Sequence, residues 1–207
     1  CAETKNIARS HANMMKGIWE NGYYNSDYAT TLGKRNIGLV GYGTIGTRVA
    51  KMMAGFGANI LVYDPYTPDD KIRADGYIPM ELNELCQQSD VISIHYRLTP
   101  ETKNMIGREQ FARMKPHAFL INTARAGLVD ESCLLDALEN HKIGGAALDV
   151  FHEEPLGPDS PYLKMDNVTL TPHIAGTASN SDELTFDIME HTLRHYFTTG
   201  QWLHVVN

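Results

Sequence analysis

The chain has 207 residues and a formal net charge of −7 at pH 7. A chain of this length can bury a sizeable core, as one large domain or as one domain with appended segments. The acidic balance argues against nucleic acid and anionic lipid as partners, because both are bound through clustered Lys and Arg side chains. We therefore expect a small-molecule partner, no nucleic acid and no membrane.

Cysteine usage and the lack of targeting segments suggest where the protein works. Cys1, Cys86 and Cys133 are odd in number and far apart, which argues against a disulfide framework and fits a reducing cytosol. No apolar run approaches the ~18 residues of a membrane span, and the first residues do not resemble a signal peptide. We expect a soluble, cytoplasmic protein.

Helical and strand patterns follow one another along the chain. Residues 7–19 place apolar side chains on one helical face, and Asn21-Gly22 is expected to end that helix. Further helical patterns lie at residues 44–55, 81–88, 108–114, 131–140 and 181–197, with Asp130 as an N-cap. Short β-rich runs lie at residues 36–40, 60–63, 91–94, 118–121, 146–150 and 168–170.

Several of these runs are apolar throughout, as in strands that are buried on both faces of a parallel sheet. The alternation predicts an α/β fold, in which a doubly wound, mostly parallel sheet carries helices on both faces. Ligands of such sheets bind at the carboxyl edge of the strands. The last helix has an apolar side that needs a packing partner.

Three glycines with the spacing Gly-x-Gly-x-x-Gly follow the first strand run and open a helix. Gly41 permits the tight turn, Gly43 lets the backbone approach a pyrophosphate, and Gly46 lets helix and strand pack closely. Free N–H groups at the helix start would face the anion. In this context the motif predicts a dinucleotide site rather than a simple strand-to-helix turn.

Asp64 ends the next strand run, 18 residues after Gly46. Its carboxylate can accept hydrogen bonds from ribose hydroxyls and would repel a 2′-phosphate by about 4 kcal/mol at ~4 Å and an effective dielectric constant of about 20. NAD is therefore expected over NADP. Taken alone, Asp64 could also simply end a strand before Pro65.

Arg125, Glu154 and His173 each follow an apolar run, so all three are expected near one cleft at the carboxyl edge. Singly, Arg125 could be a solvated charge, Glu154 could form a surface acidic pair with Glu153, and His173 could be a loop histidine. Together they favour a functional site.

These motifs, in this order and at these spacings, resemble the D-isomer-specific 2-hydroxyacid dehydrogenases. The resemblance covers nearly the whole chain and implies hydride transfer between NAD(H) and a D-2-hydroxy acid or 2-oxo acid, with Arg125, Glu154 and His173 as catalytic residues. A guanidinium can fork onto the substrate carboxylate, an imidazolium can supply the proton, and a carboxylate can orient the ring and raise its pKa.

The resemblance also implies a set of cofactor-binding residues, in which Asp149 contacts the nicotinamide amide. The set is Gly41, Tyr42, Gly43, Thr44, Ile45, Gly46, Asp64, His95, Thr102, Thr123, Ala124, Asp149, His173 and Gly176. Two positions depart from the family pattern without removing a catalytic group: Arg97 stands where Pro is usual, and Ala126 where Gly is common.

The family has a second lobe, built mainly from chain that precedes the equivalent of residues 5–20. We therefore expect a linking helix over residues 1–28, an NAD-binding domain over 29–176, and a C-terminal helix over 177–207 that returns to the substrate lobe. By resemblance the protein should form a homodimer. An NAD-binding module with little turnover and a co-regulator-like family member are the alternative functions.

No metal is expected. His191 and His195 have a helical spacing that can hold a metal ion, but they fall opposite the apolar side of their helix. His152 and its acidic neighbours lack a matched third ligand.

Overall fold

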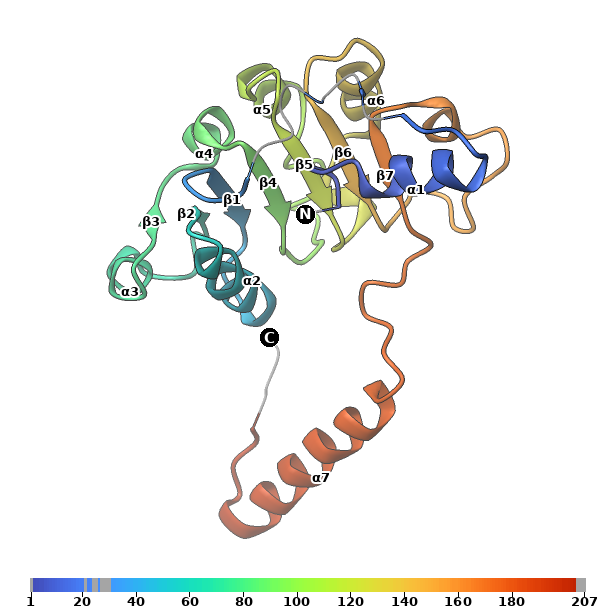
Figure 1. The fold of residues 1–207 in the computed structure, drawn as a ribbon. Coiled ribbons are helices and arrows are strands. Elements are labelled where there is room, and N and C mark those ends of the chain that lie inside the picture. The colour runs from blue at the N-terminus through green and yellow to red at the C-terminus, as the bar shows by residue number, and fades with distance from the viewer. Residues whose placement is uncertain (1, 21, 24–25, 27–30, 204–207) are drawn as a thin grey trace. The chain divides into compact units, whose positions relative to one another are not determined.

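The computed structural model describes residues 2–20, 22–23, 26 and 31–203 (Figure 1). The chain divides into two compact units, one that reaches to His173 and one that starts at Ile174. The first unit contains the sheet. Among its described residues, the second unit contains one long helix, α7 (Ser181–Thr199).

Within the described part of the chain, the sheet has seven strands in the order β3-β2-β1-β4-β5-β6-β7, and each pairing is parallel. The strands are β1 (Asn36–Val40), β2 (Asn59–Tyr63), β3 (Ile78–Pro79), β4 (Val91–Ile94), β5 (Phe119–Asn122), β6 (Gly145–Leu148) and β7 (Val168–Leu170). The chain order reverses between β1 and β4, which is the switch point of a doubly wound sheet. The predicted fold class is confirmed.

The register of the sheet aligns the carboxyl ends of the strands. Val40 pairs with Tyr63 on one side and with Ile94 on the other. Asn122 pairs in turn with Ile94 and with Leu148. The loops that follow these strands therefore all start from one edge.

Helices cover both faces of the sheet. Those of the first unit are α1 (Ile7–Met15), α2 (Thr44–Gly55), α3 (Asp69–Ala74), α4 (Leu82–Gln88), α5 (Arg108–Arg113) and α6 (Glu131–Glu139), with 3-10 turns η2 (Ala126–Leu128) and η3 (Pro161–Lys164). Leu39 packs in a smaller hydrophobic cluster with Ala50 of α2 and Ile72 of α3. Its neighbour Val40 points to the opposite face and a larger cluster that includes side chains of α4, α5 and α6.

Most predicted elements start and end within two residues of the observed ones, and Asp130 caps α6 as expected, through the backbone N–H of Cys133. The end predicted for the first helix is wrong. α1 stops at Met15 because Gly17 takes a φ of +74° and the N–H of Ile18 donates back to Asn13 O at 3.0 Å, a glycine-based helix end.

Among the described strands and α-helices, β3 and α3 have no counterpart among the predicted ones. β3 contains only Ile78 and Pro79 at the sheet edge, so it presents no alternating pattern. α3 is six residues long and buries only Ile72, which leaves almost no helical periodicity to detect.

A buried ion pair attaches the N-terminal segment to β7. Glu3 is 2% exposed, lies 2.6 Å from the Arg9 guanidinium, and accepts a hydrogen bond from the hydroxyl of Thr169. Arg9 also donates to the carbonyl oxygen of Asp166. Burial raises the pKa of Glu3 above its ordinary value. The described residues of the expected linking segment therefore pack within the first unit.

The helix of the second unit carries large exposed hydrophobic side chains. They include Leu184, Phe186, Ile188, Met189, Leu193 and Phe197. The helix ends where Gly200 takes a φ of +73°, and the ring of Trp202 then stacks on Tyr196 with 4.1 Å between centroids.

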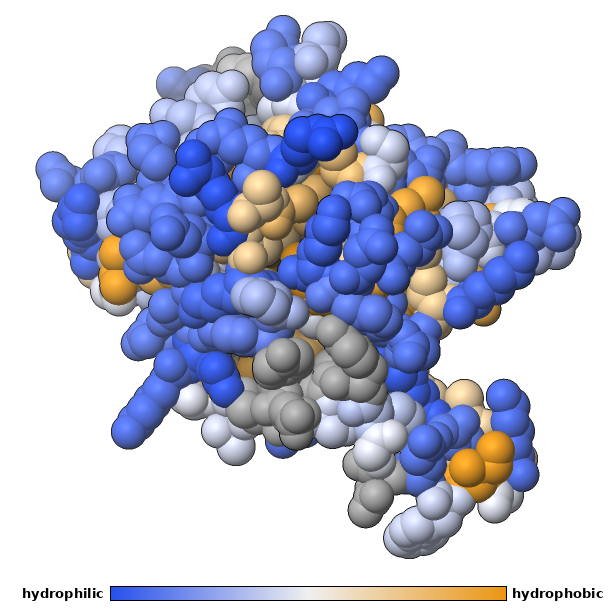
Figure 2. Space-filling view, turned by 90° about the horizontal axis from the view of Figure 1, so that it is seen from above, coloured by the Kyte–Doolittle hydropathy of each residue, from blue (hydrophilic) through white to orange (hydrophobic). Residues whose placement is uncertain are grey.

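No helix among the residues that the structure describes is long and apolar enough to cross a membrane. The face seen in Figure 2 is mostly hydrophilic, and its hydrophobic residues form small separate groups. Scattered apolar groups of this kind are ordinary on protein surfaces.

α2 begins directly against the end of β1. Gly41 has a φ of +105°, and a Cβ built on it would lie 2.6 Å from the carbonyl oxygen of His95. A Cβ on Gly46 would lie 2.1 Å from the carbonyl oxygen of Gly41. The backbone itself therefore requires glycine at both positions.

Gly46→Ala should lower the free energy of unfolding by about 1–3 kcal/mol, because the added methyl group forces the backbone of β1 and α2 apart. Gly55 is the matched control on the same helix, since nothing lies within 4 Å of a Cβ built there. Gly55→Ala should be neutral or stabilising by up to about 1 kcal/mol. Urea unfolding measures both variants, and equal stabilities would contradict the tight packing of Gly46.

Candidate active site

The turn between β1 and α2 is open on one side. Gly43 is the N-cap of α2, and no side chain caps the helix start. Nothing lies within 4 Å of a Cβ built on Gly43, so contacts within the chain do not require this glycine. Thr44 and Ile45, which follow it, are exposed. An uncapped helix start with bare backbone in front of it fits a pyrophosphate.

Asp64 follows β2, and its carboxylate holds this turn. Oδ2 accepts from the backbone N–H of Tyr42 at 2.6 Å, and Oδ1 accepts from those of Tyr66 and Thr67 at 2.9 and 3.2 Å. A carboxylate has about four acceptor sites, so Asp64 keeps capacity for a ribose hydroxyl. The hydrogen bonds by which Asp64 holds the turn could not be predicted from the sequence.

His95 follows β4 and packs against the glycine turn. Its Nε2 lies 2.9 Å from Ser93 Oγ, and burial lowers the pKa of His95 to about 4. The ring is therefore neutral near neutral pH.

Further along the same loop, the buried hydroxyl of Thr102 donates to Arg97 O at 2.8 Å and accepts from Thr99 N at 2.7 Å. Thr102 thus holds the loop together, and its contact with a cofactor stays a prediction.

Arg125 lies on a tight loop between β5 and η2, and Asn122 holds that loop. Asn122 is 2% exposed; its side-chain oxygen accepts from Ala124 N at 3.1 Å and its amide group donates to Arg125 O at 3.0 Å. The exposed Arg125 guanidinium donates through Nη1 to Ala124 O at 2.6 Å, which leaves other N–H donors for a ligand. Thr123 is exposed on the same loop.

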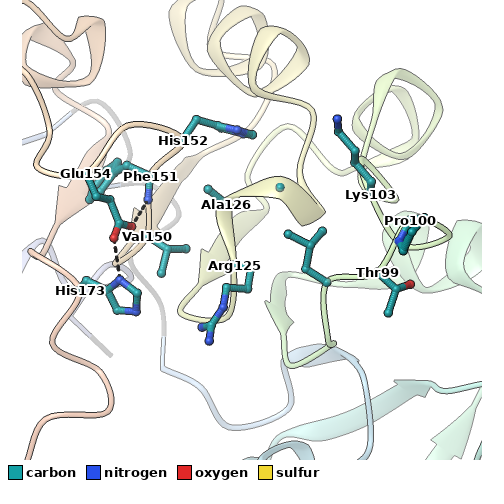
Figure 3. A pocket seen from close by; sticks show the side chains of 12 residues that line it. Thr99, Pro100, Lys103, Arg125, Ala126, Val150, Phe151, His152, Glu154 and His173 are labelled. Atoms are coloured by element: carbon teal, nitrogen blue, oxygen red, sulfur yellow. Dashed lines mark hydrogen bonds and ion pairs between the residues drawn. The ribbon is translucent and has the colours of Figure 1, made fainter. Parts of the chain in front are cut away.

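His173 and Glu154 form a hydrogen-bonded pair (Figure 3). His173 Nδ1 lies 2.8 Å from Glu154 Oε2, and Glu154 Oε1 accepts from Phe151 N at 2.8 Å. The hydrogen bond from His173, followed by that from Phe151, holds the pKa of Glu154 below its ordinary value. With an ionised carboxylate at Nδ1–H, Nε2 is left for a ligand. The partner of the imidazole is thus Glu154, whereas Glu153 lines a neighbouring cavity.

Asp149 follows β6 and is buried where three strands end. Its carboxylate accepts a hydrogen bond from the hydroxyl of Thr171, after β7, and its backbone N–H donates to Asn122 O at 3.0 Å. The carboxyl ends of β5, β6 and β7 are therefore linked to one another at this residue.

One cavity of about 850 Å³ brings the expected chemical groups together. Arg125, Glu154 and His173 all line it, and Figure 3 shows Arg125 and the His173–Glu154 pair on separate loops around it. Leu98 and Val150 supply apolar wall. The arrangement can hold a carboxylate and exchange a proton beside it.

Two other expectations concern residues of the second unit. Gly176 belongs to the second unit. His191 and His195 lie on α7, and within the described ranges no group of three His, Cys, Asp or Glu side chains could hold a metal ion.

Residues 1–175 match the NAD-binding domain of the D-isomer specific 2-hydroxyacid dehydrogenases. The chain belongs to this family. The D-3-phosphoglycerate dehydrogenase of Methanocaldococcus jannaschii is 39% identical over 194 residues, which are 93% of this chain and 36% of that protein. The glyoxylate reductase of Korarchaeum cryptofilum is 47% identical over 146 residues, 70% of this chain and 43% of that protein.

A solved structure agrees with these relatives. The crystal structure of D-lactate dehydrogenase with NAD+ from Lactobacillus jensenii matches with a TM-score of 0.80 at 31% identity, over 100% of this chain and 64% of that one. As a member of an NAD-binding domain family, the chain has NAD as its cofactor. It shares the cofactor domain of these relatives and spans 36% and 43% of the two curated ones.

His95 should make the fold less stable in acid. Because its pKa falls from an ordinary 6.5 to about 4 on folding, the unfolded chain binds more protons between these values, and stability decreases as the pH is lowered through this window. His95→Gln should remove up to about 3 kcal/mol of the loss between about pH 7 and about pH 4.5, measured by urea unfolding. His11→Gln, at an exposed histidine, is the control. An unchanged loss in His95→Gln would contradict the burial of a neutral ring.

Proposed function

We propose that this chain is the cofactor domain of an NAD-dependent oxidoreductase that transfers a hydride between NAD(H) and a D-2-hydroxy acid or its 2-oxo acid. Family membership supports the class of reaction. The observation that carries the proposal is the presence of Arg125, Glu154 and His173 around one cavity, with imidazole and carboxylate 2.8 Å apart.

Arg125 binds the substrate in this proposal. Its planar guanidinium matches the two oxygens of a carboxylate, a geometry that Lys cannot reproduce. The side chain of Asn122 holds the backbone of Ala124 and Arg125 through two hydrogen bonds and so positions the guanidinium. The same cation also polarises the neighbouring carbonyl group, because negative charge develops on its oxygen during the reaction.

His173 acts as the general acid and base in this proposal, and Glu154 orients it. NADH, when bound, supplies the hydride that adds to C2 of the 2-oxo acid. His173 donates the Nε2 proton to the carbonyl oxygen, so that the 2-hydroxy acid forms, and it takes the proton back in the reverse direction. Glu154 accepts the Nδ1–H, fixes the ring orientation and stabilises the imidazolium.

A second function, nucleotide binding with little or no turnover, is favoured by the exposure of the same pair. The side chains of His173 and Glu154 are 48% and 37% exposed. Water therefore reaches this proton donor, whereas an active site that transfers hydride efficiently excludes water. An isolated NAD-binding module and a co-regulator-like family member both fit that observation.

The domain organisation and the assembly of the protein are part of the same proposal. The exposed apolar side chains of α7 support a helix that returns to a substrate lobe, with residues 1–28 and 177–207 as the connections around an NAD-binding domain of residues 29–176. A cytoplasmic homodimer is the expected assembly.

A two-step experiment separates the two functions. Fluorescence titration with NADH measures cofactor binding, and NADH oxidation is then followed with a panel of 2-oxo acids. Binding with turnover supports the oxidoreductase, and binding without turnover supports the nucleotide-binding module. Absence of binding contradicts both.

Arg125→Lys should lower kcat/KM by about 10²-fold or more, because Lys keeps the charge but loses the fork geometry. The dissociation constant for NADH should hardly change. Arg108→Lys, at an exposed arginine at the start of α5, is the matched control and should keep both values. Steady-state kinetics and NADH titration measure the effects. Unchanged kcat/KM in Arg125→Lys would remove this residue from the mechanism.

Asp64→Ala should weaken NADH binding and narrow the preference for NADH over NADPH by about tenfold or more. The change removes the acceptor of the Tyr42 N–H, which loosens the turn, and removes the charge that repels a 2′-phosphate. Asp70→Ala, at an exposed acid in α3, should keep the wild-type ratio. The two dissociation constants are measured by titration, and an unaltered ratio in Asp64→Ala would assign cofactor preference to another residue.

A further inference from the structure

Tyr42 stands between the first two glycines of the turn and is nevertheless buried, at 4% exposed. Its ring packs in the smaller hydrophobic cluster with Ile72 of α3. The ring of Tyr77 meets it edge-on, with 6.1 Å between centroids. The side chain of the turn is thus directed away from the open side at Gly43 and into the body of the domain.

The hydroxyl of Tyr42 ends on a charged acceptor. It donates to Asp75 Oδ2 at 2.9 Å, and Asp75 is the C-cap of α3. Lys71 Nζ lies 2.9 Å from the same oxygen and 5.7 Å from the centroid of the Tyr42 ring. Burial, followed by the hydrogen bond to Asp75, raises the pKa of Tyr42 well above its ordinary value, so the hydroxyl stays a donor. Hydrogen bonds to ionised acceptors are stronger than neutral ones.

The backbone of the same residue is also held. Tyr42 N–H donates to Asp64 Oδ2 at 2.6 Å, at the end of β2. Tyr42 is therefore fastened from two directions, through its backbone to β2 and through its side chain to α3. Gly43, the next residue, begins the uncapped start of α2.

We infer that Tyr42 is a positioning residue, which anchors the phosphate-binding turn to α3 through Asp75 and so sets the amides at the start of α2 before a pyrophosphate arrives. A site that is ordered in advance does not spend binding free energy on ordering the turn. The inference rests on the proposed function for the nature of the ligand. It makes α3, which contributes no residue to the expected site, part of the support of the cofactor.

Tyr42→Phe tests this, because it keeps the ring and removes only the hydroxyl. The dissociation constant for NADH should rise about three- to tenfold. It is measured by isothermal titration calorimetry at a temperature below the onset of thermal unfolding. In the free chain, hydrogen exchange of the hydrogen-bonded amides of Gly41, Tyr42 and Thr47 should become faster while that of β6 stays unchanged. Tyr77→Phe makes the same chemical change on the neighbouring ring and should leave both measurements at wild-type values.

Asp75→Ala approaches the same bond from the exposed side and serves as the second variant if Tyr42→Phe does not fold. It should weaken NADH binding to a similar degree. The double variant Tyr42→Phe/Asp75→Ala should bind NADH no more weakly than either single variant, because all three lack the same hydrogen bond.

Wild-type NADH affinity in Tyr42→Phe and Asp75→Ala would overturn the inference and leave the proposed function standing. Faster exchange throughout the domain would also overturn it, since the bond would then stabilise the fold in general. Failure of the unaltered chain to bind NADH would instead overturn the proposed function.

Discussion

The aligned carboxyl ends of the parallel strands are the constraint on which the candidate site depends. Parallel strands in register send their following loops out from one edge, whatever the distance between them along the chain. The glycine turn leaves β1, Asp64 leaves β2, Arg125 follows β5 and His173 follows β7. The switch in strand order between β1 and β4 opens space between neighbouring loops. The match of this chain to the NAD-binding domain of its family agrees with a dinucleotide at this edge.

Side-chain oxygens that accept backbone N–H groups recur at this edge and give it rigidity. Asp64 holds the glycine turn, Asn122 holds the loop of Arg125, and Glu154 holds Phe151 while it faces His173. Each of these residues fixes a loop that carries a functional group. Loops at a sheet edge are otherwise the most mobile part of such a fold, so these bonds are what allow the site to keep a defined geometry.

The elements with a strong local pattern could be predicted from the sequence, because buried strands, long amphipathic helices and the glycine motif each leave a signature in a few neighbouring residues. Contacts between distant segments leave none. Tyr42 meets Asp75 only because α3 packs beside the turn. Glu3 is buried only because Thr169 and an arginine meet it, whereas a lone Glu is ordinarily exposed. In the sequence Asn122 only follows a predicted strand, and the hydrogen bonds by which it holds the loop are seen only in the structure.

The most direct test of the location of the site is the change in amide chemical shifts when NADH is added to the isotope-labelled chain. A dinucleotide bound at the carboxyl edge should give the largest changes at Gly43 and its neighbours and at Phe151 and His173. Amides at the amino ends of the strands, such as Asn36 and Gly145, should stay near their free values. Changes confined to that opposite edge, or to the surface between α5 and α6, would contradict a cofactor site at the carboxyl edge.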